Sequence, residues 1–238
     1  MELTRKGFLT LAGGAALALT GYGYTVATTA NAATTDAPIS QAAPADVEIV
    51  DAGYYFDKAG NGHYAVLVKN DNAGSAATGV SLSVTALGSD GQAVSAERAT
   101  QKLLLPLGTS AVCGTIAQTE DASSLAFKVH NAAGQWTKTD TTQAEFEQVV
   151  YARDLDESVD ALGFTAVSGE LANDSAETLA APDVNVVFRD ADGTVLGGAS
   201  TTLQNVPAGS TAHFAISHIA NVPDHATVEA YVNCSVNA

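Results

Sequence analysis

The turn residues of this chain occur in a pattern that repeats after about one hundred residues. Each copy contains, in the same order, an Asn-Asp pair, an Asp-Gly pair and a Pro-x-Gly triplet. The offsets between matching residues are 103, 102 and 101, so each intervening segment differs in length by one residue. Such a nearly constant period indicates a duplicated domain. The matching sets are Asn70-Asp71 with Asn173-Asp174, Asp90-Gly91 with Asp192-Gly193, and Pro106-Leu107-Gly108 with Pro207-Ala208-Gly209.

The segments between these turns alternate apolar residues with small or polar ones, as half-buried strands do. Tyr64, Val66 and Val68 share one face of segment 63–70, and residues 80–86 alternate in the same way. Glycine accepts the positive φ that tight turns need, which suits the Asp-Gly pairs to hairpins. The sequence predicts an all-β fold: two tandem immunoglobulin-like β-sandwich domains of about seven antiparallel strands each, after an N-terminal signal peptide. Helical period is weak, with candidates at Ser95–Gln101 and at Thr142–Val149, which overlaps the expected opening strand of the second domain, Glu145–Tyr151.

The N-terminal residues have the features of an export signal. Arg5 and Lys6 supply positive charge, residues 8–19 form a short apolar run, and Ala30-Asn31-Ala32 is a small-x-small cleavage site. Lys6 stands where a twin-arginine signal has its second Arg, so the twin-arginine and general secretory routes both stay open. The apolar run is short for a membrane span, and an uncleaved anchor is the alternative.

The predicted organisation has four parts. The signal peptide is followed by a segment rich in Ala, Thr and Pro that buries too little apolar surface to order itself. The predicted boundaries are 1–32 for the signal peptide, 33–46 for the flexible linker, 47–140 for β-sandwich domain 1 and 141–238 for β-sandwich domain 2.

The charge balance is strongly acidic, with 26 Asp and Glu against 10 Lys and Arg and a net charge of −16. Such a charge repels nucleic acid and anionic lipid surfaces, so neither is an expected partner. Cationic partners and divalent ions stay open, beside the simpler interpretation of a solvated acidic surface.

A family resemblance rests on four stretches of the second copy: Glu170-Leu171-Ala172-Asn173, Val186-Val187-Phe188-Arg189-Asp190, Asp192-Gly193 and Pro207-Ala208-Gly209. In this order the chain resembles the FxLYD family of bacterial exported β-sandwich domains. Val186, Phe188 and Arg189 replace the first aromatic residue, the leucine and the tyrosine of its signature. The resemblance implies an extracytoplasmic sandwich and supplies no catalytic residues.

Clustered carboxylates are the main candidates for a metal site, because hard cations bind oxygen ligands. Asp154, Asp156, Glu157 and Asp160 lie in a segment expected to be an acidic loop, with a solvated loop as the alternative. Asp190-x-Asp192-Gly193 could open a calcium loop. The first copy has Gly88 where the first ligand would stand, so a hairpin turn is the preferred interpretation.

The other reactive side chains give no catalytic pattern. The sequence lacks a Gly-x-Ser-x-Gly motif, a His-Glu-x-x-His motif and a Gly-rich phosphate loop. Alternation predicts that Cys113 and Cys234 point into the cores of separate domains as free, buried thiols. The histidines are expected on the surface rather than at a metal; they are His63, His130, His213, His218 and His225.

One group of aromatic residues offers a binding surface. Tyr54, Tyr55, Phe56 and Tyr64 could contact a sugar or a peptide. Neighbouring strand residues face opposite sides, so at most half of the group can be exposed and core packing takes the rest.

These observations favour a non-catalytic, exported binding or adhesion module at the bacterial cell envelope. Its expected partner is an unidentified protein or glycan at the cell surface, with no nucleic acid, no cofactor and no membrane span in the mature chain. One alternative is a structural or accessory subunit of a surface assembly. Another is a metal-binding protein or hydrolase that uses the acidic segments. The site is expected on loops or at the interface between the domains.

Overall fold

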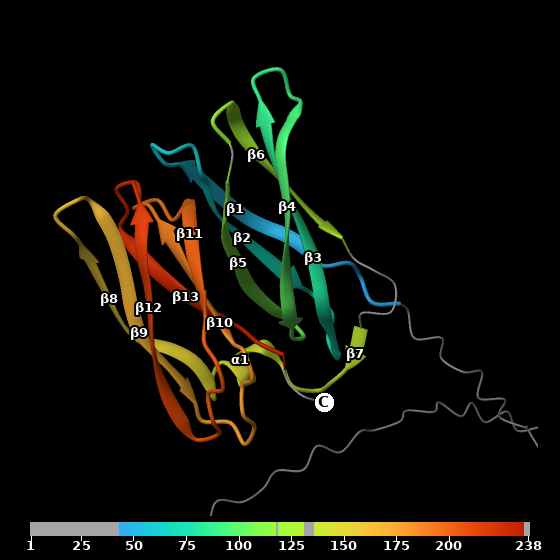
Figure 1. The fold of residues 1–238 in the computed structure, drawn as a ribbon. Coiled ribbons are helices and arrows are strands. Elements are labelled where there is room, and N and C mark those ends of the chain that lie inside the picture. The colour runs from blue at the N-terminus through green and yellow to red at the C-terminus, as the bar shows by residue number, and fades with distance from the viewer. Residues whose placement is uncertain (1–42, 118, 131–135, 236–238) are drawn as a thin grey trace, which may run out of the picture. The chain divides into compact units, whose positions relative to one another are not determined.

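The computed structural model describes residues 43–117, 119–130 and 136–235 (Figure 1). The predicted signal peptide and residues 33–42 of the predicted linker lie outside this part. The chain from Ala42 onward forms one compact unit. The described residues build antiparallel sheets and one short helix, which confirms the predicted all-β fold. Among them, no helix is long and apolar enough to cross a membrane.

The first copy of the repeat folds into two facing sheets. One has the strand order β1-β2-β5, and the other has the order β4-β3-β6, with the short strand β7 also paired to β3. The strands are β1 (Glu48–Phe56), β2 (Gly62–Asn70), β3 (Ser75–Gly88), β4 (Ala93–Leu104), β5 (Gly108–Ile116), β6 (Ala122–His130) and β7 (Trp136–Lys138).

The second copy repeats the topology of β1 to β6, and β7 has no counterpart among its described strands. Its sheets have the orders β8-β9-β12 and β11-β10-β13, so that β9 corresponds to β2 and β10 to β3. The duplication inferred from the turn spacing therefore agrees with the pairing of the strands. The elements are α1 (Gln143–Phe146), β8 (Val150–Val159), β9 (Phe164–Asn173), β10 (Asp183–Arg189), β11 (Val195–Thr202), β12 (Ser210–Ala220) and β13 (Thr227–Asn233).

Three local predictions are wrong. Residues 95–101 lie in strand β4, and most of the expected acidic loop 153–160 lies in strand β8. The expected strand opening at Glu145 is instead part of helix α1. A capping box explains this, because the Thr142 hydroxyl accepts from the Glu145 N–H (3.3 Å) and the Glu145 carboxylate accepts from the Thr142 N–H (2.8 Å). The weaker alternative, a helix within 142–149, is thus confirmed.

Each sandwich encloses its own apolar core. The inward residues of the facing sheets supply it in both copies, as the alternating pattern predicts. The largest buried side chains include Tyr64, Val66, Leu82 and Leu104 in the first copy, and Val150, Leu171, Leu179 and Phe188 in the second.

A third apolar cluster joins the two sandwiches. It forms where the outer face of sheet β1-β2-β5 packs on the outer face of sheet β11-β10-β13. Strands β2 and β10 therefore bury both faces, which accounts for their nearly continuous apolar sequences. The described strands stack as four sheets, with β4-β3-β6 and β8-β9-β12 outermost (Figure 1). The members of this cluster, called the joint below, are Ala65, Leu67, Ala111, Cys113, Val187 and Val195.

The prediction for Cys113 is half right. Both cysteines are free and buried, and Cys234 lies in the core of the second copy. Cys113, however, belongs to the joint and not to the first core, with its Sγ 3.4 Å from the carbonyl oxygen of Val186.

The error comes from a one-residue difference in strand register. Matching the Pro-x-Gly triplets aligns Cys113 with the core residue Phe214. The ladder of β5 starts at Gly108, inside its triplet, whereas the ladder of β12 starts at Ser210, one residue after its triplet. A shift of one residue moves every side chain of a strand to the other face. Val112 is therefore the counterpart of Phe214, and Cys113 faces the second sandwich.

The asparagine that closes the second strand of each copy acts as a bracket. The Asn70 carboxamide donates to the carbonyl oxygens of Ser75, Leu104 and Leu105 at 2.8, 3.1 and 3.2 Å. In the second copy the Asn173 carboxamide donates to three equivalent carbonyl oxygens, those of Glu177, Val206 and Pro207, at 2.8, 3.0 and 3.0 Å. Both side chains are fully buried, so each ties two chain segments together where water cannot substitute.

Replacement of this bracket is expected to destabilise either copy. Asn173→Ala leaves buried carbonyl oxygens without their donor, which should lower the free energy of unfolding by about 2 kcal/mol. Asn70→Ala should have an effect of the same size. Chemical denaturation measures both, with the exposed Gln204→Ala as control. Equal stability of Asn173→Ala and the control would contradict a stabilising role for the Asn173 carboxamide.

The two thiols are expected to be unreactive in the folded protein. Burial raises the pKa of the Cys113 thiol, and it raises that of Cys234 to about 11. A water-soluble thiol reagent at pH 8 should label neither cysteine in native protein and both in denaturant. Rapid labelling of Cys113 in the native state would show that the joint opens.

Candidate functional site

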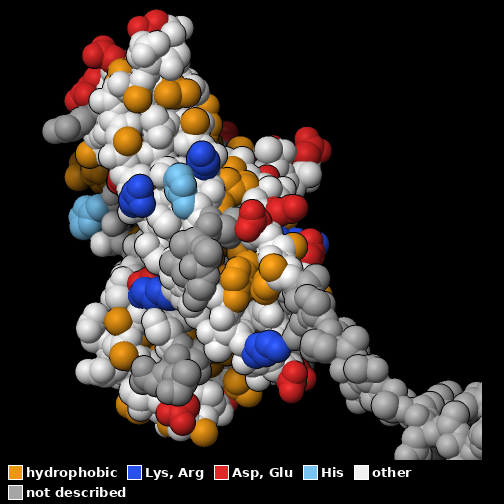
Figure 2. Space-filling model, turned by 90° about the vertical axis from the view of Figure 1, so that its right-hand side faces the viewer, with side chains coloured by type: hydrophobic (Ala, Val, Ile, Leu, Met, Phe, Trp, Pro, Cys, Tyr) orange, Lys and Arg blue, Asp and Glu red, His pale blue; other side chains and the backbone are white. Residues whose placement is uncertain are grey.

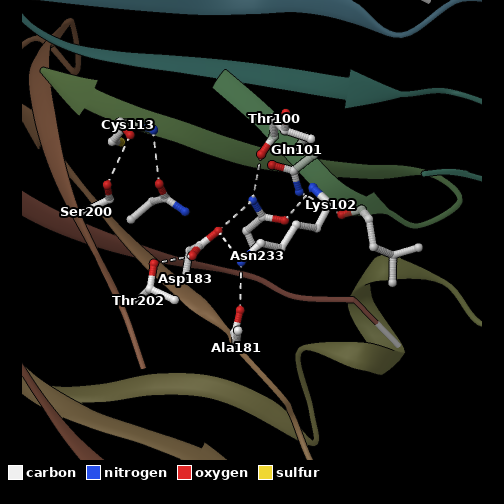
Figure 3. Close-up of polar contacts among 11 residues, drawn as sticks. Thr100, Gln101, Lys102, Cys113, Ala181, Asp183, Ser200, Thr202 and Asn233 are labelled. Atoms are coloured by element: carbon white, nitrogen blue, oxygen red, sulfur yellow. Dashed lines mark hydrogen bonds and ion pairs between the residues drawn. The ribbon is translucent and has the colours of Figure 1, made fainter. Parts of the chain in front are cut away.

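The polar contacts of the joint begin at strand β4, whose free edge is paired by a side chain. The Asn233 carboxamide accepts from the backbone N–H of Lys102 (2.8 Å) and donates to the carbonyl oxygen of Thr100 (3.2 Å) (Figure 3). One amide group from the second copy thus takes the place of a neighbouring strand along this part of the edge.

A buried-edge ion pair supports the same contact. Lys102 Nζ lies 2.7 Å from Asp183 Oδ2 and donates to the carbonyl oxygen of Ala181 at 2.7 Å (Figure 3). The other carboxylate oxygen of Asp183 accepts from the Thr202 hydroxyl at 2.6 Å. These groups are largely shielded from water, so the pair orients the two copies more firmly than an exposed pair would.

The backbone of Cys113 is held from the opposite sheet. Its N–H donates to Asn185 Oδ1 (3.0 Å), and its carbonyl oxygen accepts from the Ser200 hydroxyl (3.2 Å). The joint leaves no room for larger residues here. A Cβ added to Gly198 would lie 2.7 Å from Cys113 Sγ, and one added to Gly53 would lie 1.8 Å from the carbonyl oxygen of Val195. The sheets are therefore in direct contact.

Arg189 closes the other side of the joint. Its guanidinium lies 2.9 Å from Asp51 of the first copy and 2.9 Å from Glu229 of the second. Burial by itself would lower the pKa of Arg189, but hydrogen bonds to the two carboxylates outweigh it and raise the pKa. With Lys102 and Asn233, this residue fixes how the sandwiches lie on each other.

A pocket of about 330 Å³ lies where the two sandwiches meet at one edge of the joint. His63 and Thr115 line it from the first copy, and Ser200, Ser217 and His218 line it from the second. A second hollow of about 280 Å³ lies beside the turns of both copies, where the backbone N–H of Lys58 donates to Asn221 Oδ1. We call the first hollow the joint pocket and treat it as the candidate site.

A chain of three polar side chains leads into the joint pocket. Asp57 Oδ2 lies 3.1 Å from His63 Nε2, and His63 Nδ1 lies 3.1 Å from the Thr115 hydroxyl. The His63 ring also stacks on Tyr55, with centroids 4.9 Å apart. Since a carboxylate can only accept, neutral His63 carries its proton on Nε2, and its Nδ1 accepts from Thr115. The hydroxyl of Thr115, which lines the joint pocket, then donates to His63 and keeps its oxygen available as an acceptor.

Asp57 is held as an anion by its surroundings. Burial tends to raise its pKa. Hydrogen bonds from the backbone and side chain of Asn61, from His63 and from the Ala59 N–H outweigh burial and lower the pKa to about 2. The side chain is only 4% exposed, so this charge serves the local structure and does not reach the solvent.

The four carboxylates singled out in the sequence do not converge. Asp154 has a φ of 51° at a bulge of strand β8 and lies 3.6 Å from Arg153. Glu157 lies 3.0 Å from His225, and Asp160 accepts from the N–H groups of a turn. Asp156 lies beside Glu157 in a hollow that is separate from the joint pocket. Within the described residues, no group of three or more His, Cys, Asp or Glu side chains is arranged to hold a metal ion.

The Asp190 segment is a hairpin turn, as the sequence favours. Its carboxylate accepts from the N–H groups of Asp192 (2.9 Å) and Thr194 (2.8 Å), and Gly193 has a φ of 83°. Asp57 and Asp160 cap equivalent turns that end in Gly60 and Gly163. Each is an Asp-x-x-Gly segment, so these carboxylates shape turns.

The aromatic group does not form an exposed surface. Tyr64 is 1% exposed in the first core, and its hydroxyl donates to Glu97 at 2.7 Å. Tyr54 and Phe56 pack against the same core, while Tyr55 is buried on the side of the joint. Core and joint packing thus take the whole group.

Sequence reasoning missed His63, which it placed on the surface. The side chain is 9% exposed and is part of the joint pocket. A signal was present: residues 64–68 are all apolar, which is typical of a strand buried on both faces, and His63 precedes them directly. A polar residue next to such a run needs partners, which Asp57 and Thr115 supply.

Comparisons with known proteins add little. No protein-family model matches the sequence, and a search of curated proteins finds no match. Among solved structures, red sea bream transglutaminase matches at 8% identity with a TM-score of 0.25, over 73% of this chain and 27% of that one. A calcium-binding mutant of Bacteroides uniformis β-glucuronidase 2 matches at 16% identity with a TM-score of 0.24, over 75% and 25%. The chain spans about a quarter of these proteins, and scores this low carry no argument.

The depressed pKa of Asp57 predicts an acid-dependent loss of stability. The carboxylate stabilises the fold above its unfolded pKa near 4, and this contribution, about 2 kcal/mol, is lost as pH falls through about 2. Asp57→Asn should lack this part of the profile and be less stable at pH 7. Unfolding from pH 2 to 7 measures both, and Asp190→Asn, in an exposed turn, should cost less at pH 7. Identical profiles for wild type and Asp57→Asn would contradict the assignment.

Proposed function

We propose that this chain is a non-catalytic, exported binding module of the bacterial cell envelope that holds a ligand in the joint pocket. One observation carries the proposal: both copies of the repeat contribute polar side chains to a single hollow. Interfaces between domains are where ligand sites commonly form. The direct contacts of the joint support it further, because they keep the two walls at a fixed separation.

The lining of the joint pocket favours an uncharged, hydroxyl-rich ligand, which we take to be a neutral glycan. Thr115, Ser200 and Ser217 provide hydroxyl groups, and His63 and His218 provide imidazoles. These groups both donate and accept hydrogen bonds, as sugar hydroxyls do. Ile219 adds an apolar contact. A volume of about 330 Å³ accepts one or two sugar rings of a longer chain.

The order Asp57, His63, Thr115 is also one that enzymes use to activate a hydroxyl. Here His63 and Thr115 are direct cross-strand partners in a regular ladder, so register alone brings them together. We therefore assign this chain of side chains to positioning the Thr115 hydroxyl for binding. Exported location and the FxLYD-type resemblance belong to the same proposal and rest on the sequence.

Titration with neutral sugars tests the proposed function. We expect hexoses or N-acetylhexosamines, added to isotope-labelled protein, to cause saturable NMR shifts at Thr115, Ser200 and Ser217. Ser217→Trp fills the pocket and should weaken binding at least about tenfold, more than 1.4 kcal/mol.

The matched control is Ser123→Trp, an exposed serine of strand β6, which should bind like wild type. Absence of saturable shifts for the whole sugar panel would overturn the proposal. So would shifts that Ser217→Trp leaves unchanged.

A further inference from the structure

The joint is formed by two sheets that do not correspond to each other in the repeat. The outer face of one sheet in each copy therefore lies outside the joint. Sheet β1-β2-β5 of the first copy packs on sheet β11-β10-β13 of the second, and these two sheets are not equivalent in the repeat. The face that corresponds to β1-β2-β5 is the outer face of sheet β8-β9-β12. The face that corresponds to β11-β10-β13 is the outer face of sheet β4-β3-β6. A contact between non-equivalent faces does not close on itself, so in geometry it can repeat from chain to chain.

The open face of sheet β4-β3-β6, called the basic face below, has an unusual charge for so acidic a chain. Arg98 and Lys128 flank Ser83 in one row across the sheet, and His130 lies in the next row beside Ser81. The only carboxylate in these three strands, Glu97, points to the other side and accepts from Tyr64. Figure 2 looks onto this side of the molecule, where Lys, Arg and His side chains lie over the middle and most Asp and Glu side chains lie towards the edges.

The open face of sheet β8-β9-β12, called the acidic face below, has the opposite charge. Asp154, Asp156 and Glu170 lie in these strands with one guanidinium, that of Arg153, which pairs with Glu170 at 2.9 Å, so carboxylates outnumber Lys and Arg three to one. Glu157 is the cross-strand partner of the core residue Val167 and faces the other side of the sheet. Asp156 and Ser168 are cross-strand partners, so Asp156 lies on the side of the sheet away from the core residue Val167. Glu170 lies on the same side, two residues along β9.

The corresponding residues of the second copy already make the contact in question. Asn185 occupies the place of Ser83, and its cross-strand partner Ser200 occupies the place of Arg98. Both hold the backbone of Cys113 in the joint. The basic face is therefore the first copy's version of a surface that binds a sheet within this chain.

We propose that the chain associates head to tail with a second copy of itself, the basic face of one packing on the acidic face of the next. Charge complementarity selects this occupant, because Arg98 and Lys128 make the basic face positive and the carboxylates of the acidic face outnumber its one guanidinium. Both faces lack the apolar residues that hold the joint. The contact is accordingly weak, reversible and sensitive to salt, and it extends into short linear stacks.

Sedimentation equilibrium of the chain at low and high salt tests the inference. We expect the average mass to exceed that of the monomer at low ionic strength and to return to the monomer at about 1 M salt, where charges are screened beyond about 3 Å. The double variants Arg98→Glu with Lys128→Glu, and Asp156→Lys with Glu170→Lys, should each be monomeric. In each double variant the two faces of the proposed contact carry charges of the same sign and repel each other.

Mixing the two variants provides the decisive control. The reversed basic face of one now complements the reversed acidic face of the other, so the mixture should associate at low salt although neither component does. Thermal unfolding checks that both variants are folded. A wild type that stays monomeric, variants that associate alone, or a mixture that stays monomeric would each overturn the inference. Salt-sensitive binding of an anionic polysaccharide by a monomeric wild type would do so as well, and would assign the basic face to that ligand.

Discussion

The structure depends above all on one apolar contact, the joint between sheet β1-β2-β5 and sheet β11-β10-β13. Leu67 and Val187 are buried there between sheets whose other faces already fill separate cores. Burial of each such side chain contributes about 1.5–3 kcal/mol. Around this centre, Lys102 with Asp183 and Arg189 with Asp51 align charged groups that would otherwise lie in water. The described part of the chain thereby becomes one compact unit instead of two independent sandwiches.

The joint also explains where the candidate site and the open faces lie. Packing one sheet on another leaves a hollow at one edge of the joint, and His63 and Ser200 line it from opposite copies. Because the joint pairs non-equivalent faces, it leaves a basic face at one end of the stack and an acidic face at the other. The two proposals, a ligand in the joint pocket and association through the end faces, concern separate surfaces of the same packing.

Particular residues mark where sequence reasoning succeeded and where it failed. The turns at Asp57 and Asp190 are local, so the sequence predicts them directly, whereas Asp160 caps an equivalent turn and not the expected acidic metal site. Cys113 was assigned to the wrong sheet face, because a strand's register is set by where its ladder starts and not by the preceding Pro-x-Gly triplet. The expected acidic loop 153–160 lies mostly in strand β8, because an exposed edge strand can carry many charged residues and then lacks the apolar alternation by which strands are predicted.

The sequence by itself determined the duplication, the strand and turn pattern, the two cores and the burial of both thiols. Each of these follows from local periodicity or from turn chemistry that neighbouring residues specify. Only the tertiary structure decided which sheets meet, and with them the joint pocket, the burial of His63 and the open basic and acidic faces. Such contacts join residues more than a hundred positions apart, as in Arg189 with Asp51, and no local pattern encodes their pairing.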